Sequence, residues 1–133
     1  MVKRIAIFGS TGSIGRQALE VIATHTDKFS AEVLTAYTNE KLLIEQALAF
    51  NPNIVVIVDD RKYEAVKEAL SNTHIKVFAG EEALSEVALM NSYDLMLDAI
   101  VGYAGFQPTL NAIESGKTVA LANKETLVVF ANR

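Results

Sequence analysis

The chain has no cysteine, no excess of positive charge and no long apolar segment. Without cysteine it forms neither disulfides nor thiolate metal sites, which fits a reducing cytoplasm. Its 12 basic and 16 acidic residues give a net charge of -4, which excludes a general attraction to nucleic acid or to an anionic membrane. Its apolar runs are far shorter than the ~20 residues of a membrane-spanning helix. We therefore expect a cytoplasmic protein with no membrane or nucleic-acid partner.

The amount of apolar sequence limits the number of domains. The 133 residues, 50% of them hydrophobic, suffice for one well-filled domain but not for a cofactor domain plus a separate substrate domain. We therefore expect residues 1–133 to form a single domain.

Short β-branched runs alternate with longer segments of helical spacing, which is typical of repeated βα units on a parallel sheet. The predicted strands are 4–8, 32–36, 54–58, 75–78, 95–100 and 118–122, and the predicted helices are 13–24, 40–50, 62–71, 81–91 and 107–115. Several strands are apolar on both faces, as strands covered by helices on each side must be. The sequence therefore predicts an α/β fold, a Rossmann-type doubly wound sheet of six mostly parallel strands with helices on both faces.

Two finer features of this fold are predicted. Right-handed crossovers favour the strand order 3-2-1-4-5-6, whose ligand crevice opens at the carboxyl ends of strands one and four. In the helix predicted at 40–50, Leu43, Ala47 and Phe50 share the apolar stripe that packs on the sheet. Gln46 and two glutamates lie off this stripe, so we expect them to face solvent.

A glycine-rich loop, GSTGSIG at 9–15, follows the first predicted strand and opens the first predicted helix. Gly9 permits a tight turn, Gly12 lets the backbone approach a pyrophosphate, and Gly15 lets the helix pack closely on the strand. The helix start presents backbone N–H groups and a partial positive charge, which bind anions. The hydroxyls of Ser10, Thr11 and Ser13 add donors. The loop predicts a dinucleotide site, although the same glycine spacing also occurs in plain turns.

The tip of the second predicted strand favours NADPH over NADH. Enzymes that use NAD typically carry Asp or Glu there to accept from the ribose 2′-hydroxyl, whereas this strand ends in YTN at 37–39. Asn39 can contact a 2′-phosphate, cap the next helix, or do both. Glu40 argues against a bound 2′-phosphate. No Arg or Lys lies at the tip itself, which leaves neutral donors and Lys41 to recognise the phosphate.

Two further segments follow the fifth and sixth predicted strands. The small-residue loop at 98–106 is expected to shape the pocket floor at the crevice. The segment LANKET at 121–126 places Asn123, Lys124 and Glu125 at the ligand-binding edge of the sheet. These three residues indicate either a functional site or a helix start, capped by Asn123 and with Glu125 favoured by the helix dipole.

The glycine-rich loop, IVGYAG at 100–105, GK at 116–117 and LANKETLV at 121–128 together closely resemble the 1-deoxy-D-xylulose 5-phosphate reductoisomerase family. The resemblance covers nearly the whole chain, and LANKETLV is its most specific part. It implies the N-terminal NADPH-binding domain of a homodimeric enzyme of the non-mevalonate isoprenoid pathway. Such an enzyme converts 1-deoxy-D-xylulose 5-phosphate to 2-C-methyl-D-erythritol 4-phosphate by isomerisation and NADPH-dependent reduction, aided by Mg or Mn.

The resemblance also assigns residue roles. Lys124 would contact the sugar-phosphate substrate, and no residue of the chain is assigned a certain catalytic role. Where the family often has Gly-Lys, this chain has Tyr37-Thr38. The family's metal ligands follow the nucleotide domain in an Asp-Ser-Glu segment, so we expect no metal ligand here and cofactor binding without turnover. The residues implied to bind NADPH are Thr11, Gly12, Ser13, Ile14, Asn39, Asn123 and Glu125.

Other patterns in the chain have simpler explanations. Tyr63 and Lys67 spell the YxxxK of short-chain dehydrogenases, but they follow the third predicted strand instead of the fifth, so a solvated helix face is expected. His25 and His74 have no second ligand at metal spacing, and we expect capping or solvent exposure.

Two alternative functions remain open. One is a regulatory nucleotide-sensing Rossmann module, for which an acidic second strand tip would have been expected. The other is a fragment of a different NADP-dependent enzyme, such as a semialdehyde or homoserine dehydrogenase, which shares the fold but not the NKE sequence at 123–125.

Overall fold

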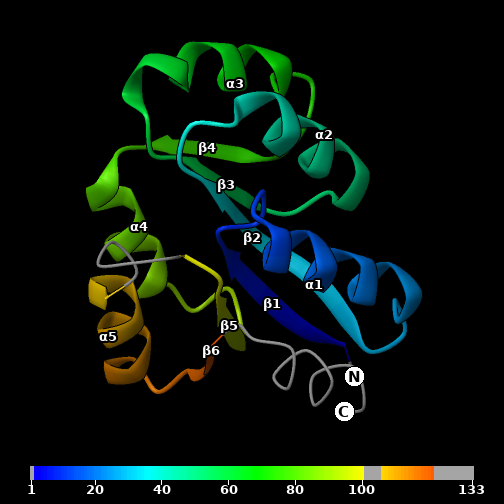
Figure 1. Ribbon diagram of the computed structural model, residues 1–133, viewed down its shortest axis with the longest axis vertical. Helices are drawn as coiled ribbons and strands as arrows, with labels where there is room; N and C mark the ends of the chain where they lie inside the picture. The colour runs from blue at the N-terminus through cyan, green and yellow to red at the C-terminus, as the bar shows by residue number, and fades with distance from the viewer. Residues whose placement is uncertain (1, 101–105, 122–133) are drawn as a thin grey trace.

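The computed structural model describes residues 2–100 and 106–121, which form one twisted sheet with helices packed on it (Figure 1). All neighbouring strands are parallel, in the order β4-β3-β2-β1-β5-β6. The strands are β1 (Lys3–Phe8), β2 (Phe29–Ala36), β3 (Ile54–Ile57), β4 (Lys76–Ala79), β5 (Leu95–Asp98) and β6 (Thr118–Leu121). The helices are α1 (Ser13–Thr24), α2 (Glu40–Phe50), α3 (Tyr63–Ala69), α4 (Glu81–Ala88) and α5 (Phe106–Glu114), with a 3-10 turn η1 (Asp60–Lys62) before α3.

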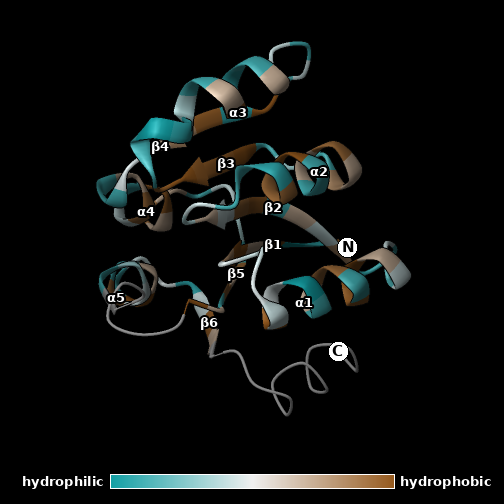
Figure 2. Ribbon diagram, turned by 45° about the horizontal axis from the view of Figure 1, so that its top comes forward, coloured by the Kyte–Doolittle hydropathy of each residue, from teal (hydrophilic) through white to brown (hydrophobic). Residues whose placement is uncertain are grey.

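The sheet separates two apolar layers. Side chains of α1, α2 and α3 pack on one face, and side chains of α4 and α5 pack on the other. The central strand β1 contributes to both layers, because Ile5 and Ile7 point to the first and Ala6 and Phe8 to the second. In Figure 2 the strands are the most hydrophobic part of the ribbon, with helices on either side. The predicted fold class is confirmed.

The predicted strand order 3-2-1-4-5-6 is wrong. β4 pairs with β3 at the edge of the sheet, and β5 is the strand that pairs with β1. The reason is that α3 packs on the same face as α1 and α2, so the chain moves outward once more before α4 carries it back over the other face. A right-handed crossover is compatible with either order. The change of direction, and with it the ligand crevice, therefore lies between β1 and β5 and not at strand four.

Element boundaries follow the predictions with small shifts. The first two helices have the predicted bounds, since a glycine-rich turn precedes one and Asn39 caps the other. β2 begins at Phe29 instead of residue 32, the helix predicted at 62–71 is divided into η1 and α3, and α4 ends at Ala88. No helix among residues 2–100 and 106–121 is long and apolar enough to cross a membrane.

Tyr93 lies fully buried beneath α4 and gives the fold a pH dependence. Its hydroxyl donates to the Ala88 carbonyl oxygen at 2.7 Å, and burial raises the pKa of Tyr93 from 10.0 to about 12. The folded state therefore favours the neutral phenol, so stability is retained below pH 10 and lost as the pH rises towards 12. We expect the melting temperature of the Tyr93→Phe variant to fall less steeply between pH 10 and pH 12 than that of wild type. Equal slopes would contradict the assignment.

Candidate functional site

A pocket of about 240 Å³ opens at the carboxyl edge of the sheet, at the ends of β1 and β5. These two strands lie side by side (Figure 1). Ligands of open α/β sheets bind at this kind of position. Ala99 and Ile100 line it, which confirms that the loop after β5 shapes the pocket; residues 101–105 of that loop lie outside the described part. The lining residues are Gly9, Thr11, Gly12, Thr35, Ala36, Tyr37, Val58, Leu84, Ala99 and Ile100.

The glycine-rich loop has the predicted geometry. Gly9 has a φ of +92°, a left-handed conformation that an L side chain rarely adopts. Gly15 packs against the loop so closely that a Cβ would lie 2.2 Å from the carbonyl oxygen of Gly9. Gly12 is the N-cap of α1, and no side chain caps this helix. No side-chain acceptor therefore caps the backbone N–H groups at the start of α1, next to the pocket residues Thr11 and Gly12.

Thr11, Ser13 and Ile14 lie where the prediction placed them, in the loop and in the first turn of α1. Thr11 lines the pocket, and Gly12 and Ser13 are exposed, so all three can be reached by a ligand. Ile14 is half-buried and packs against the apolar layer of α1.

Ser10 was wrongly expected to be a phosphate donor. It is fully buried, and its hydroxyl donates to Gln46 Oε1 at 2.8 Å, while Gln46 Nε2 donates to the Ser10 carbonyl oxygen at 2.9 Å. The loop is also held on β2, because the Gly9 and Ser10 N–H groups donate to the Thr35 hydroxyl and carbonyl oxygen at 2.9 and 2.8 Å. Ser10 therefore supports the loop from below.

Replacement of Ser10 by alanine is expected to lower the free energy of unfolding by about 1–3 kcal/mol, because it leaves the buried Gln46 amide oxygen without its donor. Urea unfolding followed by circular dichroism measures the loss. Ser13→Ala is the matched control: Ser13 is exposed, and its stability change should stay within ~0.5 kcal/mol. A Ser10→Ala variant as stable as this control would show that the Ser10–Gln46 contact does not hold the loop.

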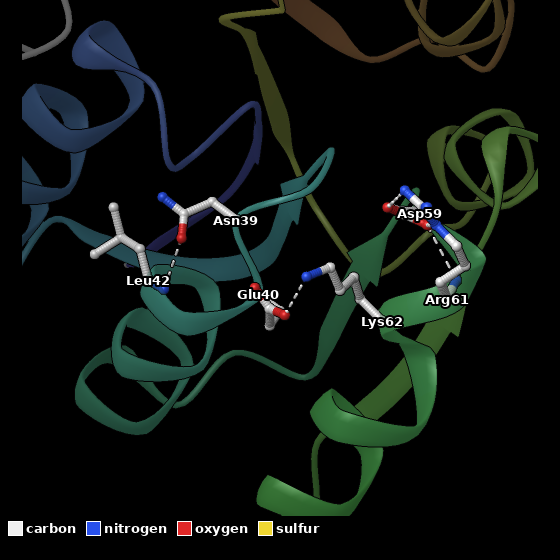
Figure 3. Close-up of polar contacts among 6 residues, drawn as sticks. All are labelled: Asn39, Glu40, Leu42, Asp59, Arg61 and Lys62. Atoms are coloured by element: carbon white, nitrogen blue, oxygen red, sulfur yellow. Dashed lines mark hydrogen bonds and ion pairs between the residues drawn. The ribbon is translucent and has the colours of Figure 1, made fainter.

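The tip of β2 carries Asn39 and Glu40 at the start of α2. Asn39 Oδ1 accepts from the Leu42 N–H at 3.1 Å, which confirms that Asn39 caps the helix (Figure 3). Glu40 forms an ion pair with Lys62, whose Nζ lies 2.7 Å from Glu40 Oε2. The hydrogen bond from Lys62 is the main reason that the pKa of Glu40 lies below its ordinary value. The carboxylate that argued against a bound 2′-phosphate is thus ionised but neutralised by a neighbouring cation.

Tyr37 closes the pocket on one side. Its side chain is 42% exposed, and its hydroxyl donates a hydrogen bond to a carboxylate oxygen of Glu81, the first residue of α4. That hydrogen bond is the main reason that the pKa of Tyr37 lies above its ordinary value. Tyr37 thereby links the end of β2 with α4, which covers the sheet face opposite to α1, α2 and α3.

The patterns with simpler explanations are accounted for. Tyr63 and Lys67 lie on α3, where Lys67 Nζ stands 5.6 Å from the Tyr63 ring centre, and neither lines the pocket at β1 and β5. His25 is the C-cap of α1 and its Nδ1 lies 2.9 Å from the Val21 carbonyl oxygen.

Three predicted site residues, Asn123, Lys124 and Glu125, lie outside the described residues. Among the residues that are described, no group of three or more His, Cys, Asp or Glu side chains could hold a metal ion.

Two residues of this edge escaped the sequence analysis. Gln46 was expected to face solvent, yet it is buried; it lies three residues after Leu43 and four before Phe50, so it shares a side of the helix with both. That spacing was a usable signal. No sequence signal pointed to Lys62, because it follows β3 in the sequence and reaches the tip of β2 only through the pairing of β2 with β3.

Comparison with known proteins identifies related sequences and structures. Residues 5–131 match the family model described as 1-deoxy-D-xylulose 5-phosphate reductoisomerase. Proteins of that description from Phocaeicola vulgatus and Porphyromonas gingivalis are 54% and 50% identical over 129 residues, 97% of this chain and 34% of each relative. A solved structure from Zymomonas mobilis, in complex with NADPH, matches with a TM-score of 0.87 and 42% identity over 96% of this chain and 34% of that chain. Another, with NADPH, fosmidomycin and magnesium, matches with a TM-score of 0.86 and 33% identity over 96% of this chain and 31% of that chain. The chain spans about a third of the length of these relatives.

Proposed function

Because the chain belongs to the 1-deoxy-D-xylulose 5-phosphate reductoisomerase family, we propose that it is the NADPH-binding part of such an enzyme. The observation that carries this proposal is the arrangement of the loop at 9–15, with Gly9 in a left-handed turn, Gly12 exposed at an uncapped helix start and the pocket directly beside it. This arrangement offers backbone donors to a pyrophosphate at the crevice between β1 and β5. The NADPH bound to the relative from Zymomonas mobilis supports the same choice of ligand.

The proposed roles follow the positions of the residues. Thr11, Gly12 and Ser13 bind the pyrophosphate through the loop and the first turn of α1, and Ile14 contacts the cofactor from the same turn. The adenosine lies in the pocket next to the Tyr37 ring. Asn39 contacts the 2′-phosphate with its amide N–H group, since its amide oxygen accepts from Leu42.

The far side of the cofactor belongs to the segment at 121–126. On the family resemblance, Asn123 and Glu125 contact NADPH and Lys124 contacts the sugar phosphate. The resemblance alone supports these three roles and a homodimer as the working state of the enzyme, and the absence of cysteine fits a cytoplasmic location.

The proposed reaction is the isomerisation of 1-deoxy-D-xylulose 5-phosphate and its reduction to 2-C-methyl-D-erythritol 4-phosphate. NADPH, when bound, supplies the hydride for the reduction. The part played by this chain is to hold the dinucleotide at its phosphates and to orient it along the carboxyl edge of the sheet. No step is assigned to a metal on the described residues, since they offer no metal ligand set.

Fluorescence titration of the chain with NADPH and NADH tests the proposal. We expect NADPH to bind more tightly than NADH. Equal affinities, or a preference for NADH, would favour a nucleotide-sensing module instead. The absence of binding by either nucleotide to a folded sample would overturn the proposal.

A further inference from the structure

We propose that Lys62, positioned by Glu40, is the cation by which this chain distinguishes NADPH from NADH, an inference that rests on the proposed function above. The residue belongs to η1, after β3, whereas the 2′-phosphate is expected at the tip of β2.

The segments after β2 and β3 run side by side. The Val58 N–H donates to the Ala36 carbonyl oxygen and the Asp59 N–H to that of Tyr37, both at 2.9 Å, so the strand pairing continues past the pocket. It places η1 beside the start of α2, where Lys62 Nζ lies 2.7 Å from Glu40 Oε2. Figure 3 shows the Lys62 side chain reaching from η1 towards Glu40, next to Asn39. The cation is thus one residue away from the expected 2′-phosphate contact.

The negative charge of Glu40 beside the tip of β2 has to be compensated before a 2′-phosphate can bind there. The residues at 37–39 carry no positive charge, and Glu40 follows them directly. An ionised carboxylate here suits the ribose 2′-hydroxyl of NADH and repels the 2′-phosphate of NADPH. The ion pair with Lys62 cancels this repulsion, and the ammonium has three donors, which allow it to bind Glu40 and a phosphate oxygen together.

The neighbouring cations are less suited to this role. The Arg61 guanidinium donates two hydrogen bonds to Asp59, Nε to Oδ1 at 3.0 Å and a terminal nitrogen to Oδ2 at 2.8 Å, so one edge of its donor plane is already paired with a carboxylate. Lys41 is exposed on α2 beyond Glu40. The Lys62 side chain is 37% exposed, so a ligand can reach it, and its partner Glu40 is 19% exposed.

The test compares Lys62→Gln with Lys67→Gln, which removes the same charge from an exposed position on α3 that does not line the pocket. Fluorescence titration at low ionic strength should show Lys62→Gln binding NADPH about tenfold more weakly than wild type, because it loses one charge-assisted hydrogen bond. The affinity of Lys62→Gln for NADH should stay within about twofold of wild type, and Lys67→Gln should bind both nucleotides as wild type does. The difference between Lys62→Gln and wild type should shrink as salt is raised.

A double variant separates a charge role from a purely structural one. In Lys62→Gln the Glu40 carboxylate is left uncompensated, so adding Glu40→Gln should recover part of the lost NADPH affinity. Equal weakening of NADPH and NADH by Lys62→Gln, or no weakening of either, would overturn the proposal while leaving the proposed function intact. Failure of the wild-type chain to bind either nucleotide would instead overturn the proposed function.

Discussion

Replacement of Gly15 by alanine is expected to lower the free energy of unfolding by about 3 kcal/mol or more. A Cβ at this position would lie 2.2 Å from the Gly9 carbonyl oxygen, 2.6 Å from the Ser10 Cα and 2.8 Å from the Ser10 carbonyl carbon. All three atoms are backbone, so no rotamer change relieves the clash. The loop cannot move away from Gly15 either, because Gly9 is packed against the Ala99 backbone on its other side. A Cβ built on Gly9 would lie only 3.0 Å from the Ala99 carbonyl group. Urea and thermal unfolding measure the loss.

Gly116→Ala is the control for this variant. Gly116 also has a left-handed φ, +79°, but nothing lies within 4 Å of the position of its Cβ. The control therefore carries only the conformational cost, about 1 kcal/mol. If Gly15→Ala were no less stable than Gly116→Ala, close packing of α1 on the loop would not be what requires glycine.

Unlike Gly15→Ala, replacement of Gly12 by alanine is expected to leave the stability of the fold unchanged and to weaken NADPH binding strongly. Gly12 has φ -77° and ψ 174°, which alanine adopts freely, and its Cβ would meet only the Gly9 carbonyl oxygen at an ordinary 3.7 Å. A methyl group at the exposed helix start would stand where a pyrophosphate must approach the backbone. We expect NADPH affinity to fall about 100-fold or more, which corresponds to ~2.7 kcal/mol of overpacking.

Calorimetric titration with NADPH measures this loss, and a thermal melt without nucleotide serves as the internal control. The melting temperature should stay within about 2 °C of wild type. An alanine variant that binds NADPH as tightly as wild type would show that the phosphates do not lie over Gly12. A variant that fails to fold would contradict the geometry described for the loop.

The predictions that succeeded depend on neighbours in the sequence. The bounds of α1 and α2 follow from a glycine-rich turn, from the cap at Asn39 and from the left-handed Asn51 that ends α2. The left-handed turn at Gly9 and the close approach at Gly15 were likewise predictable from a strand-loop-helix segment of a few residues. Capping, turns and periodicity are local, and a local pattern contains the groups that produce them.

The residues that were missed or misassigned around the site depend on distant partners. Ser10 in the glycine-rich loop was expected to donate to a phosphate, but its buried hydroxyl donates to Gln46 on α2 instead. Lys62 was overlooked, although it neutralises Glu40, because only the pairing of β2 with β3 brings the two together. In each case the side chain's role is set by a residue that no nearby sequence pattern points to.

The chain's own residue pattern was enough to predict the βα alternation, the geometry of the glycine-rich loop and the family. The order of the strands was decided by packing. Each βα unit shows the same apolar period whichever edge of the sheet it joins, so no local signal distinguishes the two edges. Which edge a new strand joins depends on which edge strand has unpaired backbone groups and on which part of the sheet is not yet covered by a helix. Here α3 covered the face already held by α1 and α2, β4 joined β3, and the crevice formed between β1 and β5.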